Sequence, residues 1–298
     1  MTDLLQLLVQ GIALGAVYGL VALGFVVIYK ATEVINFAHG ELLLLGAYLV
    51  YALRIEAGLP FFAAVPVAIA LMVAVGWGIE RSVLRRMVGR PTFAVVMITI
   101  GLAIVLRQLV TAVAGYDDRN IGDPWGASTA SLGDVQVNVV SLVTVAVVAA
   151  LVAAFFAFFR GTSAGVAMRA AALDQEAALA VGIPVRSVSA WSWMIAAAAA
   201  TVGGVFLASF PATLQPGLGF VAFRAFPAAI VGGLDSPSGA IAGGLLIGLT
   251  EVLVQGYQPQ YAPWLGNNVH VVAAYVLMIL VLMVRPYGLF GTREVERV

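Results

Sequence analysis

The sequence predicts an all-α, polytopic membrane protein, a bundle of about eight to ten transmembrane helices. Apolar residues make up 62% of the 298 positions, whereas Asp, Glu, Lys and Arg together make up only 10%. A soluble domain carries about 25% charged residues because its surface faces water. With a mean hydropathy of +1.04, this chain cannot cover such a surface, and we expect a lipid bilayer around it.

Composition also excludes several functions. The chain has no Cys and only two histidines, His39 and His270, so we expect no disulfide, no metal site and no cofactor. The one lysine, Lys30, lies between Tyr29 and Ala31 and is therefore not the lysine of a P-loop. A net charge of zero with scattered arginines argues against a nucleic-acid partner. Any energy from ATP must therefore come from another polypeptide.

Apolar runs of about twenty residues mark the individual spans. They predict helices near 4–29, 36–53, 60–80, 92–114, 139–159, 188–210, 219–234, 238–256 and 268–285. Two of these are irregular, since 219–234 is short and contains Arg224 and Pro227, and 36–53 begins with polar residues. We expect each of them to be a broken or re-entrant helix. No linker interrupts the series, so residues 1–298 are expected to form one domain.

The basic residues predict the orientation, because Lys and Arg are enriched in cytoplasmic loops. With nine spans and an outer N-terminus, only Arg54 and Arg119 fall in outer segments, together with the acidic loop 115–138. The inner segments hold Lys30, Arg81, Arg85, Arg86, Arg90, Arg160, Arg169, Arg186, Arg285, Arg293 and Arg297. We therefore expect the N-terminus outside and the C-terminus in the cytoplasm.

Glycines recur at four-residue spacing in the first and eighth predicted spans. They are Gly11, Gly15 and Gly19, and then Gly239, Gly243 and Gly248. Small residues at this interval form a flat stripe on one helix face, so that two backbones can approach closely. We interpret these glycines as helix packing within the bundle, with a subunit interface or a pore lining as the alternatives.

The hexapeptide from Asn36 to Glu41 places an amide, an imidazole and a carboxylate before an apolar run. One interpretation puts it at the inner membrane interface, where Asn36 caps a helix and Glu41 lies near the positive end of its dipole. The other makes Asn36, Phe37, His39 and Glu41 the lining or gate of a pathway, because ionisable groups at membrane depth usually face a cavity or a partner.

Three further charges lie inside predicted spans, namely Arg107, Arg224 and Glu251. An ion pair between Glu251 and an arginine would offset much of the cost of burying both charges, so we expect structural pairing, with a transport role as the alternative. There is also a faint internal repeat, because 36–41 and 233–239 each precede an apolar run rich in small residues. Inverted halves with discontinuous helices are typical of transporters.

The segment 160–187 joins two spans on the expected cytoplasmic side. Residues 165–181 are rich in Ala and Leu, which favour helix, and Gly182 and Pro184 follow as stop signals. Such a helix would be about 25 Å long. A projecting helix of this kind suits the groove of a partner protein, and we expect a coupling helix at about 165–182.

Four segments together resemble the LivH-type permeases, the membrane subunits of bacterial branched-chain amino acid ABC transporters. The first is Asn36–Glu41. The others, in the same order and spacing, are Gly165 to Ile183 with Arg169, Ala170, Asp174, Ala177 and Gly182, then Gly232 to Gly239, and finally Arg285 to Gly291. Two departures are mild: loop 115–138 shows no family pattern, and Asp235 stands where such proteins often have Gly.

The resemblance implies an importer in the bacterial cytoplasmic (inner) membrane. This chain would pair with a second, homologous permease, two cytoplasmic ATP-binding subunits and an extracytoplasmic substrate-binding protein. The segment with Arg169, Ala170, Asp174, Ala177 and Gly182 would dock on the ATPase, and Asn36–Glu41 would border the path between the permeases. The chain would then be a transporter subunit and not an enzyme. Its cargo would be branched-chain or related hydrophobic amino acids, with other amino acids, amides, urea and aromatic acids left open.

Two other functions are alternatives. A stand-alone secondary transporter or channel would need groups for ion coupling, and the predicted spans hold few ionisable residues. An intramembrane hydrolase would use Ser238 and His270, although no oriented acid or oxyanion motif accompanies them.

Overall fold

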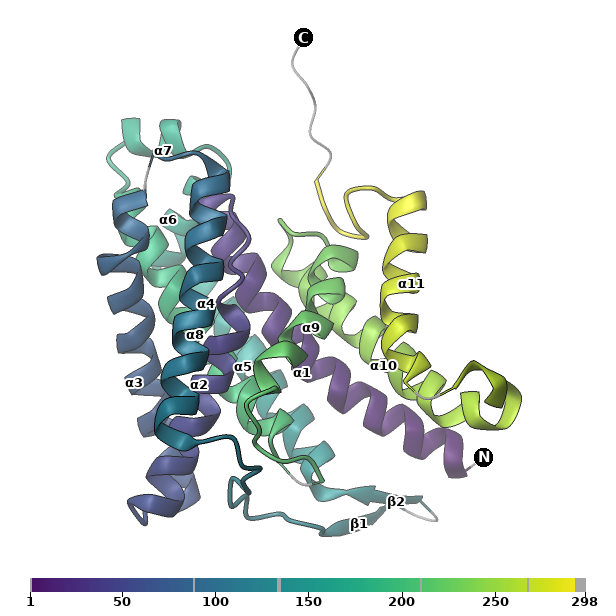
Figure 1. Cartoon of the computed structure of the whole chain (residues 1–298). Helices are drawn as coiled ribbons and strands as arrows, with labels where there is room; N and C mark the ends of the chain where they lie inside the picture. Colours follow the sequence, from purple (N-terminus) through teal and green to yellow (C-terminus); the bar gives the residue numbers. More distant parts are fainter. Residues whose placement is uncertain (1, 88, 133–134, 210, 267, 293–298) are drawn as a thin grey trace.

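The computed structural model describes residues 2–292 except 88, 133–134, 210 and 267. Within this part the chain is a bundle of α-helices with one small antiparallel hairpin, β1 (Thr129–Leu132) and β2 (Val135–Asn138), inside the expected outer loop (Figure 1). We call the end of the bundle that carries β1, β2 and the N-terminus the hairpin end. The opposite end, which carries α7 (Gln175–Ala180), is the α7 end.

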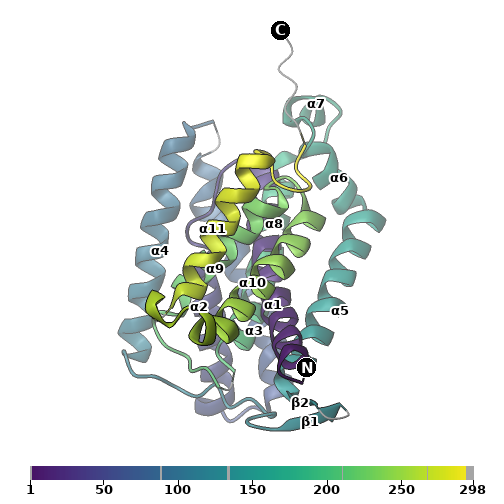
Figure 2. The same ribbon diagram turned by 90° about the vertical axis from the view of Figure 1, so that its right-hand side faces the viewer.

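In the part of the chain that the structure describes, six helices are long and apolar enough to cross a membrane, which confirms a polytopic helical bundle. They are α1 (Thr2–Thr32), α3 (Phe61–Ser82), α4 (Thr92–Ala114), α5 (Val139–Gly161), α8 (Val185–Leu207) and α10 (Pro237–Tyr261). A shorter apolar helix, α11 (Val269–Val284), follows α10 after the 3-10 turn η3 (Pro263–Leu265), and η2 (Leu84–Met87) follows α3. Helix α1 runs through the centre and packs against α5, α8, α9 and α10 (Figures 1 and 2).

The two irregular spans are half-length helices, α2 (His39–Tyr51) and α9 (Leu218–Gly232). Helix α2 begins beside Val21 of α1, about 16 Å along α1 from its end at the α7 end, and finishes near the hairpin end in the π-helical turn η1 (Ala52–Glu56). Helix α9 begins where α2 begins, since a Cβ on Gly40 would overlap the carbonyl oxygen of Gly219. Two broken helices therefore meet head to head at mid-depth. Segment 233–239, which the sequence compared with 36–41, lies instead at the α7 end.

The glycine stripes lie where α10 packs against α1 and α9. A Cβ on Gly244 would overlap the backbone nitrogen of Gly19, and one on Gly248 would overlap Gly15. A Cβ on Gly11 would lie 3.1 Å from the Cα of Leu249. On the neighbouring side of α10, Gly239 and Gly243 contact the backbone of α9 at Gly232 and Ala228. These contacts bring three helix backbones together inside the chain.

The single helix expected over 165–181 is wrong, because the segment forms two short helices, α6 (Ser163–Ala171) and α7. The backbone N–H groups of Leu173 and Asp174 both donate to the carbonyl of Ala170 and so end α6. Asp174 Oδ1 then accepts the N–H of Ala177 at 2.9 Å and caps α7. Asp favours a cap over a helix interior because its side chain competes for backbone N–H groups, and this local effect outweighs the helix propensity of the surrounding alanines.

Candidate transport site

Helices α2, α4 and α9 enclose a polar site that we call the α2–α9 junction (Phe37, Glu41, Arg107, Gly219, Phe220 and Phe223). Glu41, in the first turn of α2, is 2% exposed and forms an ion pair with Arg107 of α4. Gly219, in the first turn of α9, is so close that a Cβ on it would lie 2.7 Å from Glu41 Oε1. One carboxylate thus lies at the N-termini of two helices, whose partial positive charges favour an anion there.

Arg107 and three aromatic rings border the surface of the junction. The guanidinium carbon of Arg107 lies 3.7 Å from the ring centroid of Phe220. The Phe223 centroid is 6.4 Å from that of Phe220 and 6.5 Å from that of Phe37. The Arg107 side chain keeps 25% of its surface exposed. Because a guanidinium facing hydrocarbon is costly, this surface requires water or a polar partner.

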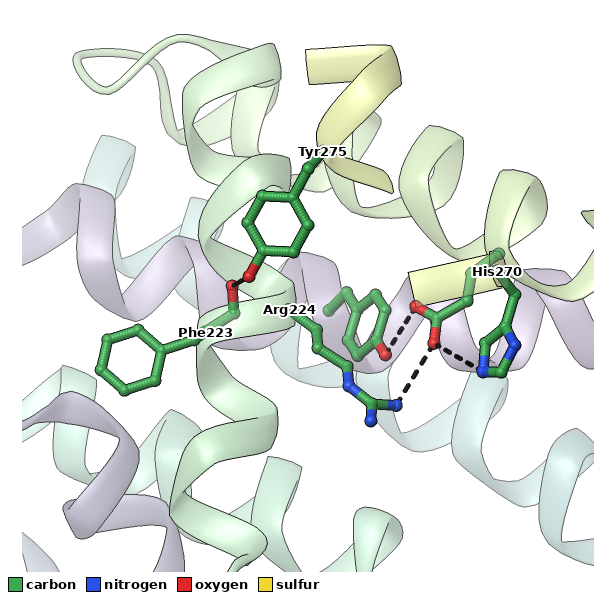
Figure 3. Close-up of polar contacts among 6 residues, drawn as sticks. Phe223, Arg224, His270 and Tyr275 are labelled. Atoms are coloured by element: carbon green, nitrogen blue, oxygen red, sulfur yellow. Dashed lines mark hydrogen bonds and ion pairs between the residues drawn. The ribbon is translucent and has the colours of Figure 1, made fainter. Parts of the chain in front are cut away.

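A second polar site, the Glu251 cluster, joins four helices (Figure 3). Glu251 of α10 accepts a hydrogen bond from the Tyr18 hydroxyl of α1 at 2.9 Å. It also forms an ion pair with Arg224 of α9 at 3.4 Å, and His270 Nε2 of α11 lies 4.0 Å away. Glu251 therefore pairs with an arginine, as expected. The Arg224 side chain is 39% exposed, so it too reaches the molecular surface at mid-depth.

Next to Arg224, the backbone of α9 is interrupted by Pro227. Proline has no N–H, so the carbonyl of Phe223, four residues earlier, loses its helical donor. The hydroxyl of Tyr275 on α11 donates to that carbonyl at 3.1 Å (Figure 3). The sequence analysis missed this tyrosine. The sequence feature that could have indicated it is a proline in one short span together with a tyrosine in the apolar span that packs against it.

Asn36 and His39 lie away from the surface of the junction. His39 is fully buried, donates from Nε2 to the carbonyl of Val21 at 3.1 Å, and contacts the ring of Phe25. Asn36 Oδ1 accepts the N–H of Ala38, the residue before α2 begins, at 3.0 Å. The segment is thus buried inside the bundle and not at its end, which corrects the interpretation at the membrane interface, and Asn36 is not itself the cap.

The residues expected to couple to an ATPase shape the α7 end. The Arg169 guanidinium lies over the ring of Phe159 of α5, and the Ala170 carbonyl, Asp174 carboxylate and Ala177 N–H make the turn between α6 and α7. Gly182 ends α7 with a φ of 84°. Around this scaffold, apolar side chains face outward, with Leu173 89% and Val181 77% exposed.

The last two segments that resemble the permease family meet at the α7 end. The N–H groups of Leu289 and Phe290 donate to the carbonyls of Val231 and Gly232 and so complete the C-terminus of α9. Asp235, at a departure from the family pattern, accepts the N–H of Thr292 on its carboxylate at 2.9 Å. Its carbonyl accepts the ammonium of Lys30 at 2.7 Å. The Asp235 side chain therefore ties the C-terminal segment to the turn before α10.

Ser238 and His270 lie too far apart to act together as a hydrolase centre. Ser238 lies in the first turn of α10, whereas His270 contacts Glu251, about 20 Å further along that helix. The hydrolase alternative is therefore wrong. Among the described residues, no three His, Asp or Glu side chains come together as metal ligands would.

Helices that stop and start at mid-depth, with charges held between their ends, are how many transporters build a path through lipid. Fold and site thus define a membrane permease. The family model described as "Branched-chain amino acid transport system / permease component" matches residues 7–282, and the chain belongs to this family.

Related proteins align with this sequence over almost its whole length. The high-affinity branched-chain amino acid transport system permease protein LivH of Escherichia coli (strain K12) is 33% identical, over 99% of this chain and 97% of that protein. The corresponding protein BraD of Pseudomonas aeruginosa is 31% identical, over 99% of this chain and 98% of its own length. A solved structure, PsaBC from Streptococcus pneumoniae in complex with Fab, superposes with a TM-score of 0.52 at 17% identity, covering 96% of this chain and 93% of that one. That similarity concerns the fold.

Proposed function

We propose that this chain is the membrane subunit through which an ATP-driven importer moves branched-chain amino acids across the bacterial cytoplasmic membrane. The observation that carries the proposal is its similarity, over 99% of the chain, to permeases named for that transport. The partners are a second, homologous permease, two ATP-binding subunits and an extracytoplasmic substrate-binding protein. The chain itself supplies the path and the contact with the ATPase.

The path runs along the surface where Arg107 and Arg224 emerge. Both lie near mid-depth, with side chains 25% and 39% exposed, and lipid is a poor environment for either. Helix α9 lies between α4 and α11 (Figure 1), and α2 packs against both α4 and α9. A second permease facing this side would enclose an aqueous path. The guanidinium groups that reach this surface, those of Arg107 and Arg224, suit the carboxylate of an amino acid.

Among the residues that the sequence suggested as a gate, Glu41 and Phe37 have the direct role. Glu41 and Arg107 hold α2 and α4 together at the junction, and the ring of Phe37 approaches that of Phe223. His39 and Asn36 support them by fixing the start of α2. Movement of α9 relative to α2 would therefore change both the width of the path and the environment of Glu41.

Contact with the ATPase is made by α6, α7 and the turn to Gly182. Leu173 and Val181 offer apolar surface at the polar end of the bundle, as expected of a docking element. Arg169, Ala170, Asp174 and Ala177 hold the shape of this surface through bonds within the chain. Closure of the ATP-binding subunits would move this segment, and the bundle would rock between two states.

The α7 end faces the cytoplasm. It carries Lys30, Arg81, Arg85, Arg86, Arg90, Arg160, Arg169, Arg186 and Arg285, whereas the hairpin end carries Arg54 and Arg119. This asymmetry supports an outer N-terminus. Arg293 and Arg297, which the sequence analysis also counted as inner, lie outside the described residues.

Uptake by the complete importer in proteoliposomes tests the proposal. With the binding protein outside and ATP inside, radiolabelled leucine should accumulate, and a non-hydrolysable ATP analogue should abolish the accumulation. The double variant Arg169→Glu, Asp174→Ala should insert normally but fail to accumulate leucine. Gradient-driven flux through this chain alone would favour a stand-alone transporter instead.

A further inference from the structure

A cavity of about 530 Å³ lies at the α7 end, apart from the α2–α9 junction. Its walls come from the end of α1, η2, the start of α4, α7 and the start of α8. Sites for small molecules usually measure about 300–1,000 Å³, so the cavity is of the size that holds one. Neither the path nor the docking surface described above uses it.

The floor of the cavity carries two hydrogen-bond donors without acceptors. Asn36 and Trp193 both line it and are only 2% and 1% exposed. Within the described part of the chain, neither Asn36 Nδ2 nor Trp193 Nε1 has a partner. Buried donors are nearly always paired, which points to a ligand with carboxylate or carbonyl oxygens at this position.

The residues at the mouth and in the walls of the cavity indicate the other chemical groups of the ligand. Glu33, Arg90 and Arg186 lie at the mouth, all exposed, and none forms an ion pair with another described residue. Between mouth and floor the walls combine the apolar side chains of Ile28, Val34, Leu84 and Val95 with polar ones, among them Thr99 and the buried Glu80, which pairs with Arg85. A molecule with a carboxylate, an ammonium group and an aliphatic branch matches all three parts.

The cavity lies between two parts of the chain that the proposed function requires to move. Gln175 and Leu179 of α7 form one wall, and Asn36, which fixes the start of α2, forms the floor. Gln175 also donates to the carbonyl of Ala31 at the end of α1 at 3.4 Å. A ligand that bridges these elements would favour the arrangement seen here over any in which α7 moves away, because it binds the two states unequally.

We propose that this cavity binds a free aliphatic amino acid from the cytosol and that its occupancy slows transport. The inference rests on the proposed function for the side of the membrane and for the amino acid used as probe. The bound molecule is the transported product, so the importer slows as the product accumulates inside the cell.

Initial rates of uptake test the proposal in the complete importer. Proteoliposomes contain ATP and unlabelled leucine from zero to millimolar concentration, and labelled leucine is presented outside with the binding protein. For the unmodified chain, internal leucine should lower the initial rate. Trp193→Phe removes the N–H and keeps an aromatic six-membered ring, so half-inhibition should need about tenfold more internal leucine, as for one lost hydrogen bond to a charged group.

Trp191→Phe is the matched control. Trp191 belongs to the same helix but contacts Phe158 of α5 and does not line the cavity, so its inhibition should equal that of the unmodified chain. Arg186→Ala, at the exposed mouth, should shift half-inhibition in the same direction as Trp193→Phe without risk to folding. Direct binding of labelled leucine to the complex in nanodiscs, without binding protein, should show the same order of affinities.

Normal uptake that internal leucine leaves unchanged would overturn this inference and leave the proposed function intact. Equal shifts for Trp193→Phe and Trp191→Phe, or no shift for Arg186→Ala, would also overturn it. Absence of ATP-dependent leucine uptake in the unmodified importer would instead count against the proposed function.

Discussion

Replacing Arg107 by Gln is the most severe test of the α2–α9 junction. Glu41 is 2% exposed, pairs with Arg107 through Oε1, and has no partner for Oε2 among the described residues. The substitution leaves a buried carboxylate uncompensated, which in buried pairs costs about 3–5 kcal/mol. Because Arg107 itself is 25% exposed, water reaches the site and we expect the lower end, about 3 kcal/mol.

Arg224→Gln provides a matched comparison within the same chain. Its partner Glu251 keeps the hydrogen bond from Tyr18 at 2.9 Å, and Arg224 is the more exposed of the two arginines. The loss should be about 1 kcal/mol. The double variant Glu41→Gln, Arg107→Gln removes both charges and should recover most of the loss caused by Arg107→Gln alone.

Thermal unfolding of the purified variants in detergent, followed by the monodisperse peak in size-exclusion chromatography, measures these differences. At about 2 °C or more per kcal/mol for a chain of this size, Arg107→Gln should lower the midpoint by about 6 °C or more and Arg224→Gln by only about 2 °C. Equal midpoints for the two single variants, or a double variant no more stable than Arg107→Gln, would show that the pair does not hold Glu41 in place.

Three further substitutions test other parts of the account. Gly244→Ala should lower the thermal midpoint by several degrees because its Cβ would overlap the backbone of Gly19. Gly101→Ala, whose Cβ meets nothing within 4 Å, should leave the midpoint unchanged or raise it slightly. Equal effects of the two substitutions would refute the close α1–α10 contact. Tyr275→Phe should cost about 1 kcal/mol, since the carbonyl of Phe223 loses its donor, and an unchanged midpoint would contradict that bond. Asp174→Ala removes the cap of α7, about 1 kcal/mol, and should reduce ATP-driven uptake far more than Asp174→Asn, which keeps a capping oxygen; similar uptake by both variants would argue against a shape-holding role.

Hydropathy predicted the long helices because burial in lipid demands unbroken apolar length, a property visible in the sequence itself. The same criterion marked the irregular spans, since Arg224 and Pro227 in one and the polar start of the other interrupt the apolar run. It could not predict that α2 and α9 meet. That contact joins Gly40 to Gly219, and no local pattern specifies which of many glycines lie opposite each other.

The sequence indicated which charged residues belong to the candidate site, but it did not indicate which residues pair with each other. Charges inside spans indicated Arg107, Arg224 and Glu251 as paired or functional, yet the partner of Arg107 is Glu41, 66 positions away in the sequence. Helix propensity concealed the break between α6 and α7, because the capping role of Asp174 depends on a single side-chain bond to Ala177. The cavity beneath α7 has no signal in the sequence at all, since its walls come from elements scattered between Ile28 and Trp193.

We propose that separate ATP-binding subunits drive this permease through α6 and α7 on the cytoplasmic side. The chain contains no Cys, so a single introduced cysteine reports on its own surface alone. Leu173→Cys replaces a side chain that is 89% exposed on that surface. Its counterpart is Tyr116→Cys, at a side chain that is 73% exposed and follows the far end of α4. A membrane-impermeant maleimide should label Leu173→Cys only from the cytoplasmic side and Tyr116→Cys only from outside, and the ATP-binding subunits should protect Leu173→Cys. Labelling of Leu173→Cys from outside the cell, or undiminished labelling in the assembled importer, would contradict the account.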